Sequence, residues 1–83
     1  MSPTVRQIGP YSFRFYSSDG DEPRHIHVYA RSHQAKFWLQ PVRLAWNRGF
    51  RPNELSEIER HIHDHLAFLI AAWNDFFQET GDE

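Results

Sequence analysis

Alternating apolar and polar residues run through the first half of the chain and predict a small β-sheet. In residues 11–16 the side chains of Tyr11, Phe13 and Phe15 fall on one face, because successive side chains of a strand point to opposite sides. A similar alternation marks three further expected strands, at residues 5–8, 25–30 and 35–39. The pattern predicts an antiparallel sheet over about residues 4–47.

Three segments interrupt the alternation. Residues 17–24 are polar and contain the turn signal Asp19-Gly20, and residues 31–34 are expected to form a hairpin turn. Residues 42–47 fit either a fifth strand or a helical turn. The predicted sheet therefore has four or five strands.

Helical spacing replaces the alternation after Gly49. Pro52 suits the first turn of a helix, where its missing N–H would have no partner in any case. Apolar residues then recur every three or four positions and form one stripe, which consists of Leu55, Ile58, Ile62, Leu66, Leu69, Ile70, Trp73, Phe76 and Phe77. We expect one long helix over about residues 52–79, ending near Gln78–Thr80 and fraying beyond it. The fold class is therefore α+β: one domain, residues 1–83, with a small sheet of four or five strands packed on one long C-terminal helix.

A second stripe on this helix is a candidate partner-binding flank. His61, His65 and Phe68 are separated by four and three residues, which places them beside the core stripe. A single helix on a sheet would leave Phe68 largely in water, so we expect either a scattered exposed aromatic or a protein partner on this flank. The sequence allows a homodimer as well.

Composition excludes several classes of protein. The chain has no cysteine, which excludes disulfides and cysteine-based zinc sites. It has no apolar run long enough for a signal peptide or a membrane span, so we expect a cytoplasmic location and no membrane partner.

Charge is distributed unevenly along the chain. Residues 1–52 hold eight of the nine Lys and Arg residues, whereas residues 53–83 hold eight of the eleven Asp and Glu residues. A basic half favours an anionic partner such as RNA. The alternative is that the two halves attract each other across the fold.

The sheet face opposite the helix, called the open face below, is expected to be basic and aromatic. It would carry Arg14, Tyr16, His25, His27, Tyr29, Lys36 and Trp38, joined by Arg43 if its segment is a strand. Cations bind phosphates and rings stack on bases. The candidate nucleic-acid-binding residues are Arg14, Tyr29, Trp38 and Arg43; the alternative is an ordinary solvated sheet face.

The pair His25 and His27 is the sharpest chemical signal, because residues two apart on a strand lie side by side. Two imidazoles can act as general acid and base, and with Lys36 stabilising the charged transition state they would suit metal-independent cleavage of RNA. They can equally bind a metal ion with a carboxylate from residues 19–22. A third alternative is structural, with both rings donating to the loop backbone. We assign no metal and no cofactor from the sequence.

The chain resembles a family of small bacterial proteins, the domain of unknown function 4160. The resemblance is carried by segments along nearly the whole chain: Ile8-Gly9-Pro10-Tyr11, Phe13-Arg14-Phe15-Tyr16-Ser17, His25-Ile26-His27-Val28, Ala35-Lys36-Phe37-Trp38-Leu39, Asn47-Arg48-Gly49-Phe50 and Ala72-Trp73-Asn74-Asp75-Phe76-Phe77. Two positions depart from the family pattern: Arg51 replaces a serine before the helix, and Arg24 replaces a second proline.

The family resemblance implies a genetic context and leaves the target open. Members look like one half of type II toxin–antitoxin modules, so a small antitoxin-like protein is the expected partner. We expect a toxin component that acts on RNA or translation through the open face, and a ribonuclease if the histidines are catalytic. The alternatives are a non-catalytic protein- or nucleic-acid-binding module, such as an antitoxin, and a metal-binding protein that uses His25 and His27.

Overall fold

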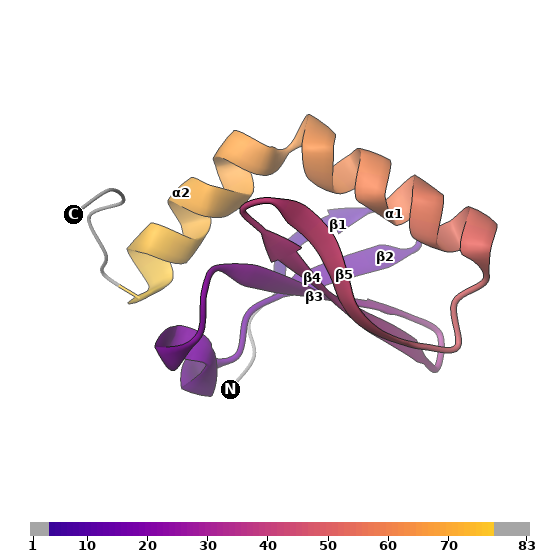
Figure 1. Ribbon diagram of the computed structural model, residues 1–83, viewed down its shortest axis with the longest axis horizontal. Coiled ribbons are helices and arrows are strands. Elements are labelled where there is room, and N and C mark those ends of the chain that lie inside the picture. Colours follow the sequence, from indigo (N-terminus) through magenta and orange to yellow (C-terminus); the bar gives the residue numbers. More distant parts are fainter. Residues whose placement is uncertain (1–3, 78–83) are drawn as a thin grey trace.

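The computed structural model describes residues 4–77 and consists of a five-stranded sheet covered on one face by two helices (Figure 1). The elements follow in the order β1 (Thr4–Ile8), β2 (Tyr11–Arg14), a 3₁₀ turn η1 (Ser17–Asp21), β3 (His25–Ala30), β4 (His33–Leu39), β5 (Val42–Arg48), α1 (Pro52–Asp64) and α2 (Leu66–Phe77). All neighbouring strands are antiparallel, in the order β1-β2-β3-β4-β5. The α+β class and the antiparallel sheet expected from the sequence are confirmed.

The segment at residues 42–47, ambiguous in the sequence, is the fifth strand. The register of β5 against β4 shifts between the pairs Lys36–Trp46 and Phe37–Leu44, so Ala45 is an extra residue. A bulge of this kind interrupts the two-residue alternation, which is why the pattern fitted a helical turn as well. The shift returns Trp46 to the same face as Arg43.

The single long helix expected from the sequence is divided at His65. The backbone of His65 has φ −117° and ψ 21°, and its N–H donates to the carbonyls of both His61 and Ile62. The His65 ring nitrogen Nδ1 also donates to the His61 carbonyl, at 2.9 Å. Competition for one carbonyl loosens the helical ladder at this turn. Figure 1 shows that α1 and α2 meet at an angle over the sheet. The expected helix end near Gln78–Thr80 and the fraying beyond it lie outside the described residues.

The core lies between the sheet and the helices. Alternate residues of β2, β3 and β4 meet the buried residues of the helices, which are Ile58, Ile62, Leu69 and Trp73. Phe15 packs edge-on against Trp73. Most of the stripe read from the sequence is therefore core, although Phe76 remains 38% exposed.

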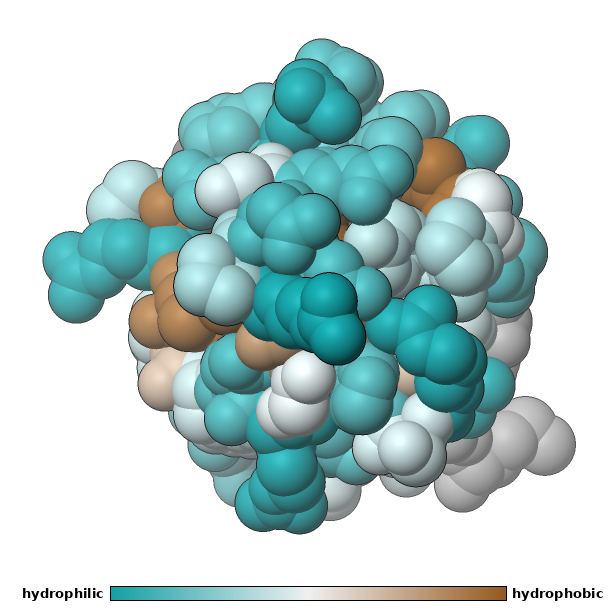
Figure 2. All heavy atoms as spheres, turned by 90° about the vertical axis from the view of Figure 1, so that its right-hand side faces the viewer, coloured by the Kyte–Doolittle hydropathy of each residue, from teal (hydrophilic) through white to brown (hydrophobic). Residues whose placement is uncertain are grey.

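The surface of the described residues is largely polar. Exposed large apolar side chains are scattered: Leu44 on β5, and Phe68 and Phe76 on α2. Figure 2 shows the end of the molecule where α1 begins as mainly hydrophilic, with small separate hydrophobic areas. Neither described helix is long and apolar enough to cross a membrane.

Candidate metal centre

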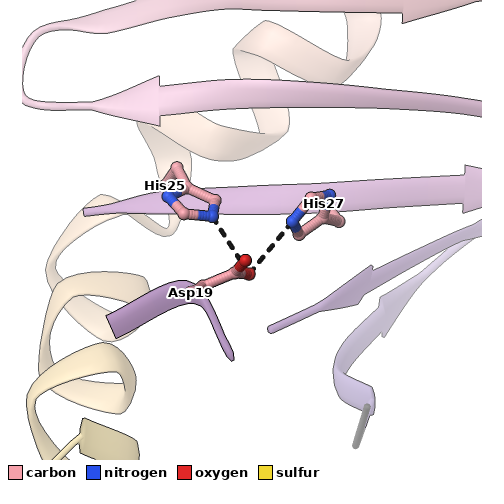
Figure 3. A group of neighbouring side chains, drawn as sticks. All are labelled: Asp19, His25 and His27. Carbon is pink, nitrogen blue, oxygen red and sulfur yellow. Dashed lines mark hydrogen bonds and ion pairs between the residues drawn. The ribbon is translucent and has the colours of Figure 1, made fainter. Parts of the chain in front are cut away.

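Two histidines of β3 and one aspartate of η1 converge on the open face. His25 and His27 occupy alternate positions of β3, so their rings project to the same side. The η1 turn connects β2 to β3 and folds back over these rings, which directs Asp19 toward both of them (Figure 3). The Oδ2 atom of Asp19 lies 3.0 Å from Nε2 of His25 and 3.0 Å from Nε2 of His27.

Local contacts fix the position of Asp19. Its Oδ2 atom accepts the backbone N–H of Tyr16 at 3.1 Å, which closes the start of η1. The Tyr16 ring packs edge-on against His27, with 4.5 Å between ring centroids. A β-carbon at Gly20 would lie 3.0 Å from the Phe77 ring, so the turn packs closely on α2. Asp19 is therefore held over the histidines by both the sheet and a helix.

The His25 ring has a defined tautomer. Its Nδ1 atom lies 2.9 Å from the backbone oxygen of Pro23, and a carbonyl only accepts, so Nδ1 carries a proton. In a neutral ring the Nε2 atom then presents a lone pair to Asp19. The side chain has no exposed surface, so bulk water does not reach the ring.

The contact between His25 and Asp19 has the distance of a hydrogen bond without its alignment. Within residues 4–77, Nε2 of His25 has no hydrogen-bond partner although the carboxylate oxygen is only 3.0 Å away. The oxygen therefore lies off the axis along which the nitrogen would direct a proton. Two ligand atoms that flank one cation have this off-axis relation, because each directs its lone pair at the ion and not at the other ligand.

Burial favours the neutral form of His27, which is the form that binds metals. Burial is the largest influence on this ring and lowers the pKa of His27, although the Asp19 carboxylate acts in the opposite direction. Metal ions bind the unprotonated nitrogen of a neutral imidazole. The Nε2 atom of His27 has hydrogen-bond geometry toward Asp19, and a carboxylate only accepts, so this nitrogen carries the ring proton, which a bound ion would displace. The Nδ1 atom of His27 is buried without a partner among the described residues.

A second layer of contacts surrounds the three side chains. Lys36, on β4, pairs with Glu22 at 2.6 Å, and this hydrogen bond lowers the pKa of Glu22. The same Glu22 oxygen lies 3.6 Å from Nδ1 of His25. Trp38 and Trp73 pack edge-on against the His25 ring, with centroid distances of 5.6 and 5.1 Å. His25 is therefore confined by rings from both the open face and the helix layer.

The spacing of the three ligand atoms suits a divalent ion. All three lie within 4.8 Å of one another. Bonds of about 2.0–2.1 Å in a tetrahedral site separate neighbouring ligand atoms by about 3.3 Å, so small rotations of these side chains would complete the geometry. Histidines that bind metals usually donate their other N–H to a carbonyl or carboxylate, as His25 does to Pro23.

The residues predicted to bind nucleic acid share the open face. The strand register aligns Arg14 with His27, and Trp38 with both His25 and Arg43. Tyr29 lies beneath the guanidinium of Arg14, which is 4.9 Å from its ring centre. The predicted catalytic residue Lys36 lies beside His27 in the register, but its ammonium group contacts Glu22 and the Trp38 ring.

The flank predicted to bind a partner is only partly available. Phe68 is 40% exposed, and the guanidinium of Arg6 lies 4.1 Å above its ring. His61 packs near the Tyr11 ring, and His65 ends α1. The break at His65 interrupts the flank as a continuous helical surface, and partner binding at these three residues stays a prediction.

Sequence reasoning missed the residues that complete the histidine pair. It placed the carboxylate somewhere in residues 19–22, because nothing in their composition separates Asp19 from Asp21 or Glu22. The bond from the His25 ring to the Pro23 carbonyl agrees with the structural alternative, in which the rings donate to the loop backbone, although the sequence did not indicate which loop residue accepts. The one usable signal is the position of Asp19 three residues after Tyr16, since an aspartate there can accept the N–H that opens the turn.

Comparison with models of known protein families gives a match for this chain. A family model described as Domain of unknown function (DUF4160) matches residues 11–74, which include β2 to β5, all of α1 and most of α2. The matched range contains all three residues of the candidate metal centre. Comparisons with curated proteins and with solved structures gave no match.

Proposed function

The chain belongs to the DUF4160 family, and from the geometry of its histidine pair we propose that it is a divalent-metal-binding protein. The ligands are Nε2 of His25, Nε2 of His27 and a carboxylate oxygen of Asp19. Two imidazoles and one carboxylate suit Zn²⁺ and other first-row divalent ions.

One observation carries the proposal: the buried Nε2 of His25 faces Asp19 at 3.0 Å without a hydrogen bond. With Nδ1 protonated toward Pro23, a neutral ring would set a lone pair against a carboxylate. A buried polar atom without a partner costs about 1–3 kcal/mol, and a cation between the two groups removes this cost. A second proton on His25 is the competing explanation, and metal titration separates the two.

Binding of a metal ion would hold the η1 turn against the sheet. The three ligands come from η1 and β3, so an ion joins the turn to the sheet. Three protein ligands leave a fourth position of a tetrahedral ion for water or another small ligand. The Asp19 side chain is 13% exposed, which gives that position a path to solvent.

The acid–base role in RNA cleavage has weaker geometric support. A general acid or base must come within hydrogen-bond reach of the reacting group, and His25 is fully buried beneath η1. Movement of the turn would be required first. The toxin role stays a prediction that metal binding neither requires nor contradicts.

Zinc titration tests the proposal. The purified chain, freed of metal by a chelator, is titrated with Zn²⁺ by calorimetry and by competition with a chromophoric chelator. One ion per chain is expected. Asp19→Asn and His27→Gln should each weaken binding by at least tenfold to a hundredfold, with the folded state of each variant verified by circular dichroism.

A matched control comes from the helix histidines. His61 and His65 lie four residues apart, a spacing that also suits a zinc ion. His61→Gln removes one of these imidazoles and should leave zinc affinity unchanged. If wild type binds no zinc, the proposal is wrong. It is also wrong if His61→Gln weakens binding while His27→Gln does not.

A further inference from the structure

Beyond the metal centre, the open face carries two rows of basic, polar and aromatic side chains, whose alignment is set by the strand register. One row across the sheet contains Arg14, His27, Lys36 and Trp46, and the adjacent row contains Ser12, Tyr29, Gln34 and Arg48. Trp46 and Arg48 were not among the predicted site residues, because the bulge in β5 hid the face on which they lie.

Arginine and aromatic side chains on this face are already paired. The guanidinium of Arg14 lies 4.9 Å from the centre of the Tyr29 ring, and that of Arg48 lies 5.2 Å from the centre of Trp46. Such pairs hold a phosphate-binding cation beside a ring that can stack on a base. Tyr29 and Trp46 are each partly exposed.

The cations of the open face are not neutralised by the acidic helices. Among residues 4–77, no carboxylate lies within ion-pair distance of Arg14, Arg43 or Arg48. The pair Arg31–Glu54, which joins the two halves of the chain, lies at the β3–β4 turn. The helices cover the opposite face (Figure 1), so the fold separates the acids of α1 and α2 from these three arginines.

We propose that the open face binds single-stranded nucleic acid, with Arg14, Arg43 and Arg48 on phosphates and with Tyr29 and Trp46 stacking on bases. Tyr29 and Trp46 lie two strands apart, on β3 and β5, which is about 10 Å. That separation allows two bases of an extended strand to stack separately. Binding of nucleic acid to this surface should depend on the rings as well as on the charges, whereas binding of any other polyanion should depend on the charges alone.

Fluorescence anisotropy of a labelled 12-nucleotide RNA measures the interaction. Trp46→Leu should weaken binding by about fivefold to a hundredfold, which corresponds to the loss of the free energy of one base–aromatic stack. Arg48→Ala should lower the slope of log affinity against log salt by about 0.7, one phosphate contact on a single strand. Arg48 is exposed, so its replacement leaves the core intact.

Matched controls lie in the helix layer. Arg60→Ala removes the same charge from α1, and Phe68→Leu removes an exposed ring from α2; neither should change the affinity by more than twofold. If wild type does not bind RNA in 50 mM salt, the proposal is overturned. It is also overturned if Trp46→Leu and Phe68→Leu behave alike, or if Trp46→Leu weakens binding to inorganic polyphosphate as much as binding to RNA.

Discussion

The Nε2 atom of His25 lies 3.0 Å from Oδ2 of Asp19, yet the two atoms do not form a hydrogen bond. Because Nδ1 of His25 donates to the Pro23 carbonyl, the other ring nitrogen is the one that lies beside the carboxylate. Few buried pairs in a folded protein remain in this state without a proton or a cation between them.

Zinc should stabilise the fold. At a free concentration one hundred times the dissociation constant, a bound ion adds about 2.7 kcal/mol to the free energy of unfolding. For a domain of this size the melting temperature should then rise by roughly 10–20 °C. Asp19→Asn should remove most of this rise, while its amide oxygen can still accept the Tyr16 N–H. An equal rise in wild type and variant, measured by scanning calorimetry, would contradict the site.

Tyr11 should make the stability depend on alkaline pH. Burial, and then the 2.9 Å hydrogen bond to Glu57, raise the pKa of Tyr11 to about 12. The unfolded chain loses this proton near pH 10, so the stabilisation is fully present below pH 10 and is lost as the pH rises toward 12. Tyr11→Phe should cost about 0.5–1.5 kcal/mol at pH 7. In urea unfolding the difference from wild type should shrink above pH 10; a constant difference from pH 8 to 12 would refute this explanation.

Gly49 should tolerate alanine much less well than Gly9. Both have positive φ, 106° and 57°, but a β-carbon at Gly49 would collide with the His33 ring, whereas at Gly9 it meets open space. Gly9→Ala should cost about 1 kcal/mol and Gly49→Ala about 2 kcal/mol or more. His33→Ala should recover part of the loss in the Gly49→Ala background. Equal costs in denaturant unfolding would show that the contact with His33 is unimportant.

Induced expression of the chain in a bacterial host tests the toxin expectation. Wild type should arrest growth, and the double variant Trp46→Leu/Arg48→Ala should relieve the arrest if the open face is the effector surface. Phe68→Leu serves as the control and should still arrest growth at an equal folded yield. Normal growth with wild type would make the toxin expectation wrong in that host and would favour the antitoxin or binding-module alternative.

The sequence predicted what depends on local periodicity and missed what depends on register and turn geometry. The alternation in β2 to β4 placed His25 and His27 side by side on the open face, as found. The carboxylate partner could not be chosen, because the path of η1 over the sheet decides between Asp19 and its neighbours. The face of Trp46 could not be assigned, because one extra residue at Ala45 reverses the alternation.

The break between α1 and α2 could not be predicted from residue spacing either. The three- and four-residue spacing continues through His65 without interruption, so the pattern predicts one helix. At the break the ring of His65 reaches the His61 carbonyl, a contact that periodicity does not encode.

Anomalous X-ray scattering at the zinc absorption edge, on crystals grown with equimolar Zn²⁺, tests the central claim most directly. We predict one strong peak bounded by His25 Nε2, His27 Nε2 and an Asp19 oxygen, with metal–ligand distances of about 2.0–2.2 Å. A peak at His61 and His65, or no peak among these three residues in crystals of the zinc-titrated protein, would contradict it.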